Sequence, residues 1–369
     1  MILHLVNDEK VIDNTVTSFE TALPGQNIFL CFLKGHPKHV SKGGNIFFIE
    51  NGKVPDSVSL LNVKAIIIHY LSYDKITFIE KDNAFANIPI YWIMWGGDFY
   101  NRLLYSRGFP LYYKFHWPGL KYLVKHIFNR LGIFSRTDRF INRFIKERIS
   151  YCLTTKEEFA LCMKYMGSIF KNIKCIDNFF YYPIDMILGS NADKAAKGRI
   201  VLVGNSCSFT NNHLCVLKYI KHLDLTNKEI VMPLNYGGHE KYKQRIVKRG
   251  YRYFGSNFHP LLSFMPLDQY NRIMLKSEVC IYGSWRQEAN GNIIIALYLG
   301  AKVFMSRKSP LFLYYTNMGL LLFPLESITQ EKVDTPLSEK EKLHNRLILI
   351  TRFNKDAQLN AIRKIWDVN

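Results

Sequence analysis

Two polar loops in the second half of the chain carry residue types that bind phosphate. The apolar run 200–203 ends in Gly204, Asn205 and Ser206, and a helix is expected to begin a few residues later. A loop of small residues between a strand and a helix lets backbone amides approach a phosphate. Taken alone, this run is better explained as an ordinary strand-to-helix turn.

The second loop, 281–292, runs directly into an apolar helix and contains Arg286. Amides at a helix N-terminus and an arginine that never loses its charge suit a departing nucleoside diphosphate. A loop that only caps a buried helix is the alternative, but the convergence of polar groups favours a binding site. A third loop, after 228–233, fits either binding or simple turn chemistry. The candidate donor-binding residues are Gly204, Asn205, Ser206, Asn235, Tyr236, Arg286, Gln287, Glu288, Gly291 and Asn292.

In the first half, Asp98 and His69 are candidates for a general base. His69 ends one strand-like run and Asp98 follows another; Asp98 comes after two glycines, where the backbone can turn and present the carboxylate to a cleft. Such a group could take a proton from an acceptor hydroxyl. A hydrogen-bonded structural histidine is the stronger interpretation of His69 alone, and helix capping is the alternative for Asp98. Other residues expected to line this acceptor cleft are Asp8, Asp13, Trp95 and Gly97.

Several common motifs do not occur in the sequence. Without Asp-x-Asp, and with His36 and His39 better explained by a surface turn, no metal site is expected, so protein groups would neutralise the diphosphate. The sequence also lacks G-x-G-x-x-G, a Walker lysine and Gly-x-Ser-x-Gly, which argues against a dehydrogenase, a P-loop ATPase and a serine hydrolase.

The elements that position these loops form two alternating series. Short strands are predicted at 1–6, 27–33, 45–50, 63–69 and 88–95, then at 199–203, 228–233, 279–282 and 301–305. Helices are predicted at 211–223, 239–249, 267–277 and 291–299. Runs that are apolar at every position indicate parallel sheets covered on both faces. We therefore expect an α/β protein with two doubly wound lobes, 1–188 and 199–337, joined by the linker 189–198, with helices in 338–369 packing across the junction.

The basic residues are concentrated in one segment. The 369 residues carry a formal charge of +19, and residues 102–148 contain eleven Lys or Arg, two acidic residues and eleven aromatics. Apolar residues at helical spacing beside basic ones are typical of a helix lying in a membrane interface, and a solvated helical hairpin is the alternative. The residues expected at the membrane are Lys121, Lys125, Phe128 and Arg130.

Seven scattered cysteines without a Cys-x-x-Cys pair favour a reducing cytoplasm. The N-terminus is predicted to be a strand and not a signal peptide, and no stretch is long and apolar enough to cross a bilayer.

Several segments resemble the family of 4-acetamido-4,6-dideoxygalactosyltransferases, glycosyltransferase family 56, which add a sugar to the polyprenyl-diphosphate-linked precursor of enterobacterial common antigen. The likeness extends in order from Leu3 to Met305. It lies in 92–100 (WIMWGGDFY), 200–206 with Asn212 and His213, 231–236 with Glu240 and Tyr242, then Tyr270, Leu275, Arg286, Gln287, Gly291, Gly300 and Ala301.

This resemblance implies a GT-B fold, with the acceptor in the first lobe and a dTDP- or UDP-sugar in the second. It further implies inverting, metal-independent transfer to a lipid-linked oligosaccharide for common antigen or O-antigen, by a protein peripheral on the cytoplasmic face of the inner membrane. A sugar-nucleotide epimerase of the same fold is the alternative, although it would not need a basic amphipathic surface. A nucleic-acid-binding protein would explain the charge, but the sequence contains no recognised binding module.

Overall fold

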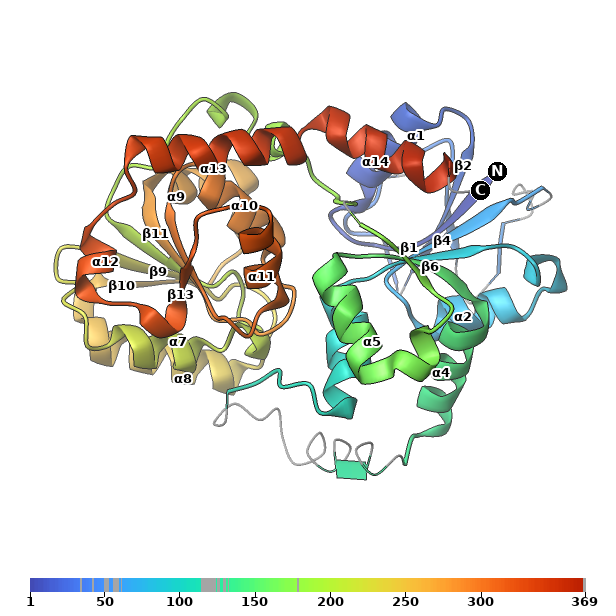
Figure 1. Cartoon of the computed structure of the whole chain (residues 1–369), viewed down its shortest axis with the longest axis horizontal. Helices are drawn as coiled ribbons and strands as arrows, with labels where there is room; N and C mark the ends of the chain where they lie inside the picture. Colours follow the sequence, from blue (N-terminus) through green and yellow to red (C-terminus); the bar gives the residue numbers. More distant parts are fainter. Residues whose placement is uncertain are drawn as a thin grey trace. The chain divides into compact units, whose positions relative to one another are not determined.

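The computed structural model describes residues 1–33, 35–41, 43–49, 53–55, 60, 62–113, 124, 127–128, 131, 133–177 and 179–367. The chain divides into two compact units (Figure 1). Unit 1 comprises Met1–Phe109, Val124–Pro183 and Lys355–Asn369, and unit 2 comprises Pro110–Leu123 and Ile184–Asn354. Both units are therefore assembled from segments that are far apart in the sequence.

Unit 1 is built on a seven-stranded parallel sheet in the order β3-β2-β1-β4-β5-β6-β7. Because the chain runs outward through β2 and β3 and then returns to the other side of β1, the strand order reverses between β1 and β4. The strands are β1 (Ile2–Asn7), β2 (Asn27–Phe32), β3 (Ile46–Ile49), β4 (Ala65–His69), β5 (Ile90–Ile93), β6 (Ile149–Leu153) and β7 (Lys174–Ile176).

Helices cover both faces of this sheet, as the fully buried residues of β4 require. In Figure 1, α1 (Ile12–Ala22) and α14 (Lys355–Asp367) lie on one face, and α2 (Tyr73–Glu80), α4 (Arg136–Arg148) and α5 (Lys156–Phe170) lie on the other. A π-helical segment, Gly97–Leu104, follows β5. The last helix thus completes the core of the unit in which the chain begins.

Unit 2 has a six-stranded parallel sheet in the order β10-β9-β8-β11-β12-β13, and its strand order reverses between β8 and β11. The strands are β8 (Ile200–Val203), β9 (Glu229–Pro233), β10 (Phe258–Leu261), β11 (Ser277–Tyr282), β12 (Lys302–Met305) and β13 (Phe323–Pro324). The helices are α6 (Ile184–Leu188), α7 (His213–Ile220), α8 (Glu240–Phe254), α9 (Leu267–Lys276), α10 (Asn290–Tyr298), α11 (Pro310–Asn317), α12 (Gln330–Asp334) and α13 (Glu339–Arg352).

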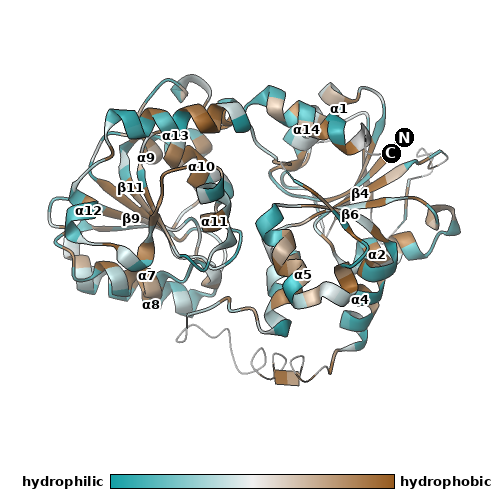
Figure 2. Ribbon diagram, in the orientation of Figure 1, coloured by the Kyte–Doolittle hydropathy of each residue, from teal (hydrophilic) through white to brown (hydrophobic). Residues whose placement is uncertain are grey.

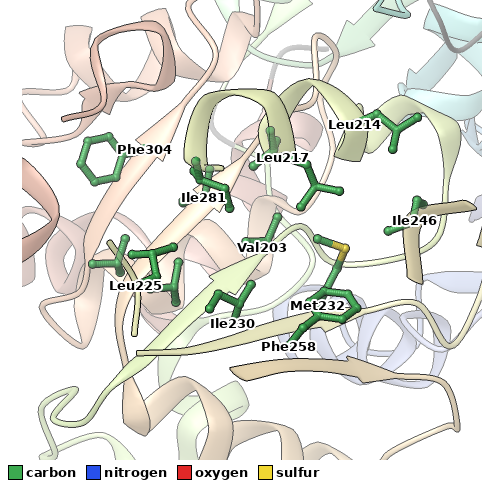
Figure 3. Close-up of a cluster of buried hydrophobic side chains, with 14 of the residues drawn as sticks. Val203, Leu214, Leu217, Leu225, Ile230, Met232, Ile246, Phe258, Ile281 and Phe304 are labelled. Carbon is green, nitrogen blue, oxygen red and sulfur yellow. The ribbon is translucent and has the colours of Figure 1, made fainter. Parts of the chain in front are cut away.

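One part of the core of unit 2 lies between its sheet and helices α7 and α8. Figure 3 shows Val203, Ile230 and Met232 of the strands beneath Leu214 and Leu217 of α7. In Figure 2 the strands of both sheets carry much of the hydrophobic colour, whereas α8 and α12 expose hydrophilic residues. Burying these side chains fixes the sheet, and the polar loops at the carboxyl ends of the strands remain available.

The predicted strands and helices are confirmed with small shifts at their ends, and β6, β7, β10 and β13 were not predicted. The segment 189–198 is not the linker, because its backbone is tied into unit 2. Ala196 N–H donates to the Leu299 carbonyl (2.7 Å), and Lys197 N–H donates to the Leu275 carbonyl (2.8 Å). Besides the boundaries of Pro110–Leu123, the chain passes between the units at 183/184 and 354/355, which places α13 in unit 2 and α14 in unit 1.

Only part of the predicted membrane helix is described. Lys121, Lys125 and Arg130 lie outside the described residues. Phe128 is described, and 48% of its surface is exposed. Among the described residues, no helix combines the length and the apolarity needed to cross a bilayer.

Candidate functional site

Glycine is required at the turn that follows β8. Gly204 has φ 72°, and an added Cβ would lie 3.0 Å from Asn211 Oδ1 and 3.2 Å from His213 Nε2. The predicted neighbours have different roles. Ser206 is buried and its Oγ accepts from Asn211 Nδ2 (3.0 Å), whereas Asn205 N–H donates to Asn211 Oδ1 (3.3 Å). Asn211, which the sequence analysis did not single out, therefore shapes this loop.

Glu288 connects the β8 loop to the β11 loop. Its carboxylate accepts from Thr210 Oγ1 (2.6 Å), Asn211 Nδ2 (3.3 Å) and Ser284 Oγ (3.2 Å). Arg286 Nη2 forms an ion pair with the same carboxylate at 3.3 Å. Because both charged side chains are about nine-tenths buried, this pair is held more firmly than one on the surface. Arg286 therefore lies at this edge as predicted, but it already has a carboxylate partner.

The first turn of α10 presents uncapped backbone amides at the same edge of the sheet. Ala289 has φ 62°, and no side chain caps the helix among the described residues. Gly291 is exposed, and a Cβ added there would meet no atom within 4 Å. The adjacent Asn292 Nδ2 donates to Tyr270 Oη (3.0 Å). Free N–H groups at a helix N-terminus attract anions, so this turn suits a phosphate.

Two buried amide oxygens at the ends of adjacent strands have no hydrogen-bond donor among the described residues. They are Asn205 Oδ1, after β8, and Asn235 Oδ1, after β9. Asn205 Nδ2 also donates to Tyr236 Oη at 3.3 Å, and Tyr236 is 55% exposed. Buried acceptors without donors call for an explanation, and hydroxyl groups of a bound ligand would supply the missing donors. Gln287, the remaining predicted residue, is half-buried in the β11 loop.

In unit 1, the Asp98 carboxylate is buried and not presented to a cleft, which corrects the expectation from the sequence. Its residue is only 2% exposed. Oδ2 accepts from Leu71 N–H (2.7 Å) and Trp92 Nε1–H (2.9 Å), and Oδ1 accepts from Trp95 N–H (2.9 Å). Burial raises the pKa of Asp98 to about 7, although these three donors act in the opposite direction. Asp98 holds together the loops that follow β4 and β5. This structural role is similar to helix capping, which was the alternative interpretation of Asp98.

His69 is likewise enclosed, because both of its ring nitrogens have protein partners. Nε2 lies 3.1 Å from His4 Nδ1, and Nδ1 lies 3.1 Å from Tyr181 Oη. The residue is 1% exposed, and burial lowers its pKa well below the usual value. The prediction of His69 as a base is therefore not supported by its surroundings, whereas a hydrogen-bonded structural role fits them.

A chain of hydrogen bonds runs through Asn27, His4, His69, Tyr181 and Trp95, and the groups at its two ends determine which atoms donate. The Asn27 amide nitrogen donates to the carbonyl oxygen of Leu23 (2.8 Å), which leaves its oxygen to accept from His4 Nε2–H (3.2 Å). At the other end, Trp95 Nε1–H can only donate, and it does so to Tyr181 Oη (2.7 Å). The neutral rings of His4 and His69 then each carry their proton on Nε2, and neither keeps a nitrogen for a substrate.

The other predicted acceptor residues hold neighbouring loops. Asp8 accepts from the N–H groups of Lys38, His39 and Val40, and Asp13 accepts from the N–H and Oγ of Ser41. Gly97 has no room to spare, since an added Cβ would lie 3.2 Å from the ring of Tyr70. These contacts place Asp8, Asp13, Trp95 and Gly97 around the carboxyl edge of the sheet in unit 1. Within the part of the chain that the structure describes, no group of three His, Cys, Asp or Glu side chains could hold a metal ion.

Comparison with solved structures identifies the architecture. The chain resembles sucrose-phosphate synthase from Thermosynechococcus elongatus (TM-score 0.67, 10% identity, 100% of this chain and 98% of that chain covered). It also resembles Anabaena HepE, solved in complex with UDP and glucose (TM-score 0.63, 10% identity, 100% of both chains covered). A third is the UDP-forming α,α-trehalose-phosphate synthase from Burkholderia vietnamiensis (TM-score 0.62, 9% identity, 100% and 98% covered). Two parallel α/β units of this kind define the GT-B fold.

The sequence comparison gives the family. Residues 136–355 match the family model described as 4-alpha-L-fucosyltransferase, glycosyl transferase group 56. This match covers more than half of the chain. The chain therefore belongs to glycosyltransferase group 56, which confirms the resemblance found in the sequence, and it is a glycosyltransferase.

Proposed function

We propose that this glycosyltransferase moves a sugar from a dTDP- or UDP-sugar to a hydroxyl group of a polyprenyl-diphosphate-linked oligosaccharide in bacterial surface polysaccharide biosynthesis. The observation that carries the donor half is the convergence, at one edge of the sheet in unit 2, of the α10 amides, Arg286 and the unpaired oxygens of Asn205 and Asn235. HepE was solved with UDP and glucose, and an Escherichia coli structure in the comparison holds UDP-2-fluoro glucose. A nucleoside-diphosphate sugar is the donor that this edge fits.

In the proposed mechanism, the diphosphate binds at the first turn of α10. The N–H groups of Gly291 and Asn292 and the guanidinium of Arg286 offset the negative charge that develops as the nucleoside diphosphate leaves. Glu288 keeps Arg286 in place through their ion pair. Asn205 and Asn235 accept hydrogen bonds from hydroxyl groups of the sugar or of the nucleoside. Because these protein groups supply the counter-charge, we propose transfer without a metal ion.

Three parts of the proposal are based on the resemblance to the family: the acceptor, the stereochemistry of transfer and the location of the protein. The family resemblance supports a lipid-linked acceptor, a 4-amino- or 6-deoxy-type sugar, transfer with inversion, and common antigen or O-antigen as the pathway. The charge of +19, with residues 102–148 especially basic, supports docking on the anionic cytoplasmic face of the inner membrane. Nucleic acid is not a proposed partner.

The test is a transfer assay with the full chain, radiolabelled dTDP- and UDP-sugars, and polyprenyl-diphosphate-linked glycans in vesicles. We expect label in the lipid fraction, equimolar nucleoside diphosphate, an inverted anomeric centre by NMR, and unchanged activity with EDTA. Arg286→Ala is expected to raise the KM for the donor at least about tenfold, because charge-assisted contacts contribute about 1.5–3 kcal/mol. Arg272→Ala, which removes a guanidinium that is 77% exposed, is the matched control.

Two results would contradict this proposal. Isomerisation of the donor sugar without an acceptor would favour an epimerase of the same fold. Tight donor binding without transfer to any lipid-linked glycan would reject the acceptor class.

A further inference from the structure

We propose that Glu9 is the general base that takes the proton from the acceptor hydroxyl. The assignment rests on the proposed function, because it concerns the hydroxyl that attacks the donor sugar. Glu9 follows β1 and precedes α1, at the point where the strand order of unit 1 reverses. In open parallel sheets, ligands bind outside the carboxyl ends of the strands at this point of reversal.

Residues that follow β1 and β4 come together at this edge. The two strands pair in parallel, with Leu5 opposite Ile68, so the loop that holds Glu9 leaves the sheet beside Tyr70. The backbone of Tyr70 is strained, with φ 68°. A non-glycine residue in this conformation persists only where its surroundings enforce it, and such residues cluster at functional sites. The strained turn is an independent indication that this edge binds substrate.

Four other acidic or histidine side chains at this edge are held by contacts within the protein. Asp8 accepts three backbone N–H groups at 2.6–2.9 Å. Asp13 accepts the N–H and the hydroxyl of Ser41. The carboxylate of Asp98 and the ring nitrogens of His69 are buried, with all their partners inside the protein. Asp98 and His69 are buried and cannot present a lone pair to a substrate, whereas the carboxylates of Asp8 and Asp13 hold the backbone of residues 38–41.

Glu9 differs from these four residues because it is exposed and its carboxylate makes no hydrogen bond or ion pair with the described part of the protein. Its backbone is nevertheless fixed, because the Glu9 carbonyl accepts from Ile12 N–H (3.0 Å) at the start of α1. Partial burial raises the pKa of Glu9, and the neighbouring charges act in both directions. Those neighbours are Asp8, which raises the pKa, and Lys10, His39 and Lys75, which lower it.

The reaction step balances without any further reagent. The acceptor oxygen forms a bond to the anomeric carbon while the bond from that carbon to the diphosphate oxygen breaks. The acceptor proton passes to the Glu9 carboxylate, and the electron pair of the broken bond leaves with the nucleoside diphosphate. Glu9 returns its proton to water after the products depart. A positioned base of this kind contributes about 10²–10⁴-fold to the rate.

The experiment compares Glu9→Gln with Asp74→Asn in the full chain, using the lipid-linked acceptor assay. Asp74 is an exposed carboxylate at the start of α2 and provides the same carboxylate-to-amide change in the same unit. We expect Glu9→Gln to lower kcat at least about 100-fold with an unchanged melting temperature and an unchanged donor KM. Asp74→Asn should behave as wild type, and Glu9→Asp should restore part of kcat.

The pH profile of kcat provides a second readout. Wild type should lose activity as acid protonates the base, and the residual activity of Glu9→Gln should lack this acid limb. A Glu9→Gln variant with kcat within about threefold of wild type would overturn the assignment while leaving the proposed function intact. Absence of transfer by the wild-type chain to any acceptor would overturn the proposed function and this assignment with it.

Discussion

Two buried side chains of unit 1, Lys75 and Asp98, hold one turn of backbone. Lys75 is fully buried, and its Nζ donates to the carbonyl oxygens of His69 and Tyr70. Asp98 accepts from Leu71 N–H. Between these contacts lies the left-handed backbone of Tyr70, a conformation that costs about 1–3 kcal/mol. We infer that the hydrogen bonds of these two side chains serve to maintain this turn, which explains why neither side chain faces solvent.

The pH dependence of stability tests the role of Lys75. Burial is the main cause that lowers its pKa to about 7, whereas in the unfolded chain it stays protonated up to about pH 10.5. The unfolded state therefore binds more protons between these values. Stability should rise with pH in this window, by up to about 1.4 kcal/mol per pH unit from this group, and should fall as the pH returns to 7.

Hydrogen exchange of β1 and β4 amides at pH 7.5 and 9 measures this effect. In Lys75→Met the contribution should vanish, so the stability difference between variant and wild type should change with pH. If the stability difference between Lys75→Met and wild type were the same at both pH values, Lys75 would have an ordinary pKa.

At the scale of elements, the proposed donor edge of unit 2, which comprises the loops after β8 and β11 and the first turn of α10, depends on close contact between β11 and α7. Gly283 follows β11, and a Cβ added there would lie 2.5 Å from Val216 Cγ2 and 2.7 Å from the Asn211 carbonyl oxygen. This approach brings the β11 loop near enough for Glu288 to accept from Thr210 and Asn211. The two loops are therefore positioned by the packing of their elements, and Glu288 then joins them.

Alanine substitutions at Gly283 and Gly291 should distinguish an effect on packing from an effect on donor binding. Gly283→Ala should destabilise the protein by about 1–3 kcal/mol, because the methyl group meets backbone as well as side chain. Gly291→Ala meets no atom within 4 Å, so it should keep the melting temperature and yet weaken donor binding by filling the space before the α10 amides. Thermal unfolding and calorimetric titration with UDP or dTDP measure both. Equal destabilisation by the two variants would contradict this account of the donor edge.

At the scale of the whole molecule, the net charge and the exposed apolar residues of 102–148 both favour the proposed partner, an anionic membrane surface. Within this segment, the exposed apolar residues among those described are Val124, Ile127, Phe128, Leu131 and Ile133, which are 42–69% exposed. Isolated exposed apolar residues are normal, but several in a short, strongly basic segment are typical of a membrane-binding surface.

Binding to lipid vesicles checks this surface. The full chain should cosediment with vesicles that contain phosphatidylglycerol, and binding should weaken as salt is raised, because screening reduces the attraction. Phe128→Ser combined with Leu131→Ser should reduce binding at least about tenfold, since about 2 kcal/mol or more of apolar burial is lost. Phe264→Ser, at a residue of unit 2 that is 68% exposed, is the matched control. Equal binding to neutral vesicles would contradict an electrostatic contribution.

The sequence by itself determined the two-sheet architecture. Continuous apolar runs such as 65–68, punctuated by turn residues, require buried parallel strands, and every predicted strand is present. Of the four strands that were not predicted, β7, β10 and β13 lie at sheet edges, where strands are only partly buried and their apolar signal is weak. The fourth, β6, lies inside the sheet, but the partly exposed Ser150 and Tyr151 interrupt its apolar run. The loops of the donor edge were also predictable, since the carboxyl ends of parallel strands must meet at one edge of a sheet.

Only the tertiary structure decided where the domains divide and which side chains remain available. Residues 189–198 have the composition of a linker, but their hydrogen-bond partners, Leu275 and Leu299, are distant in sequence. Asp98 looks like a catalytic carboxylate until its three donors are known, and Glu9 carries no local signal at all. Residue type and spacing specify what a side chain can do. Whether its lone pairs are already satisfied depends on contacts between distant segments, and these form only when the chain folds.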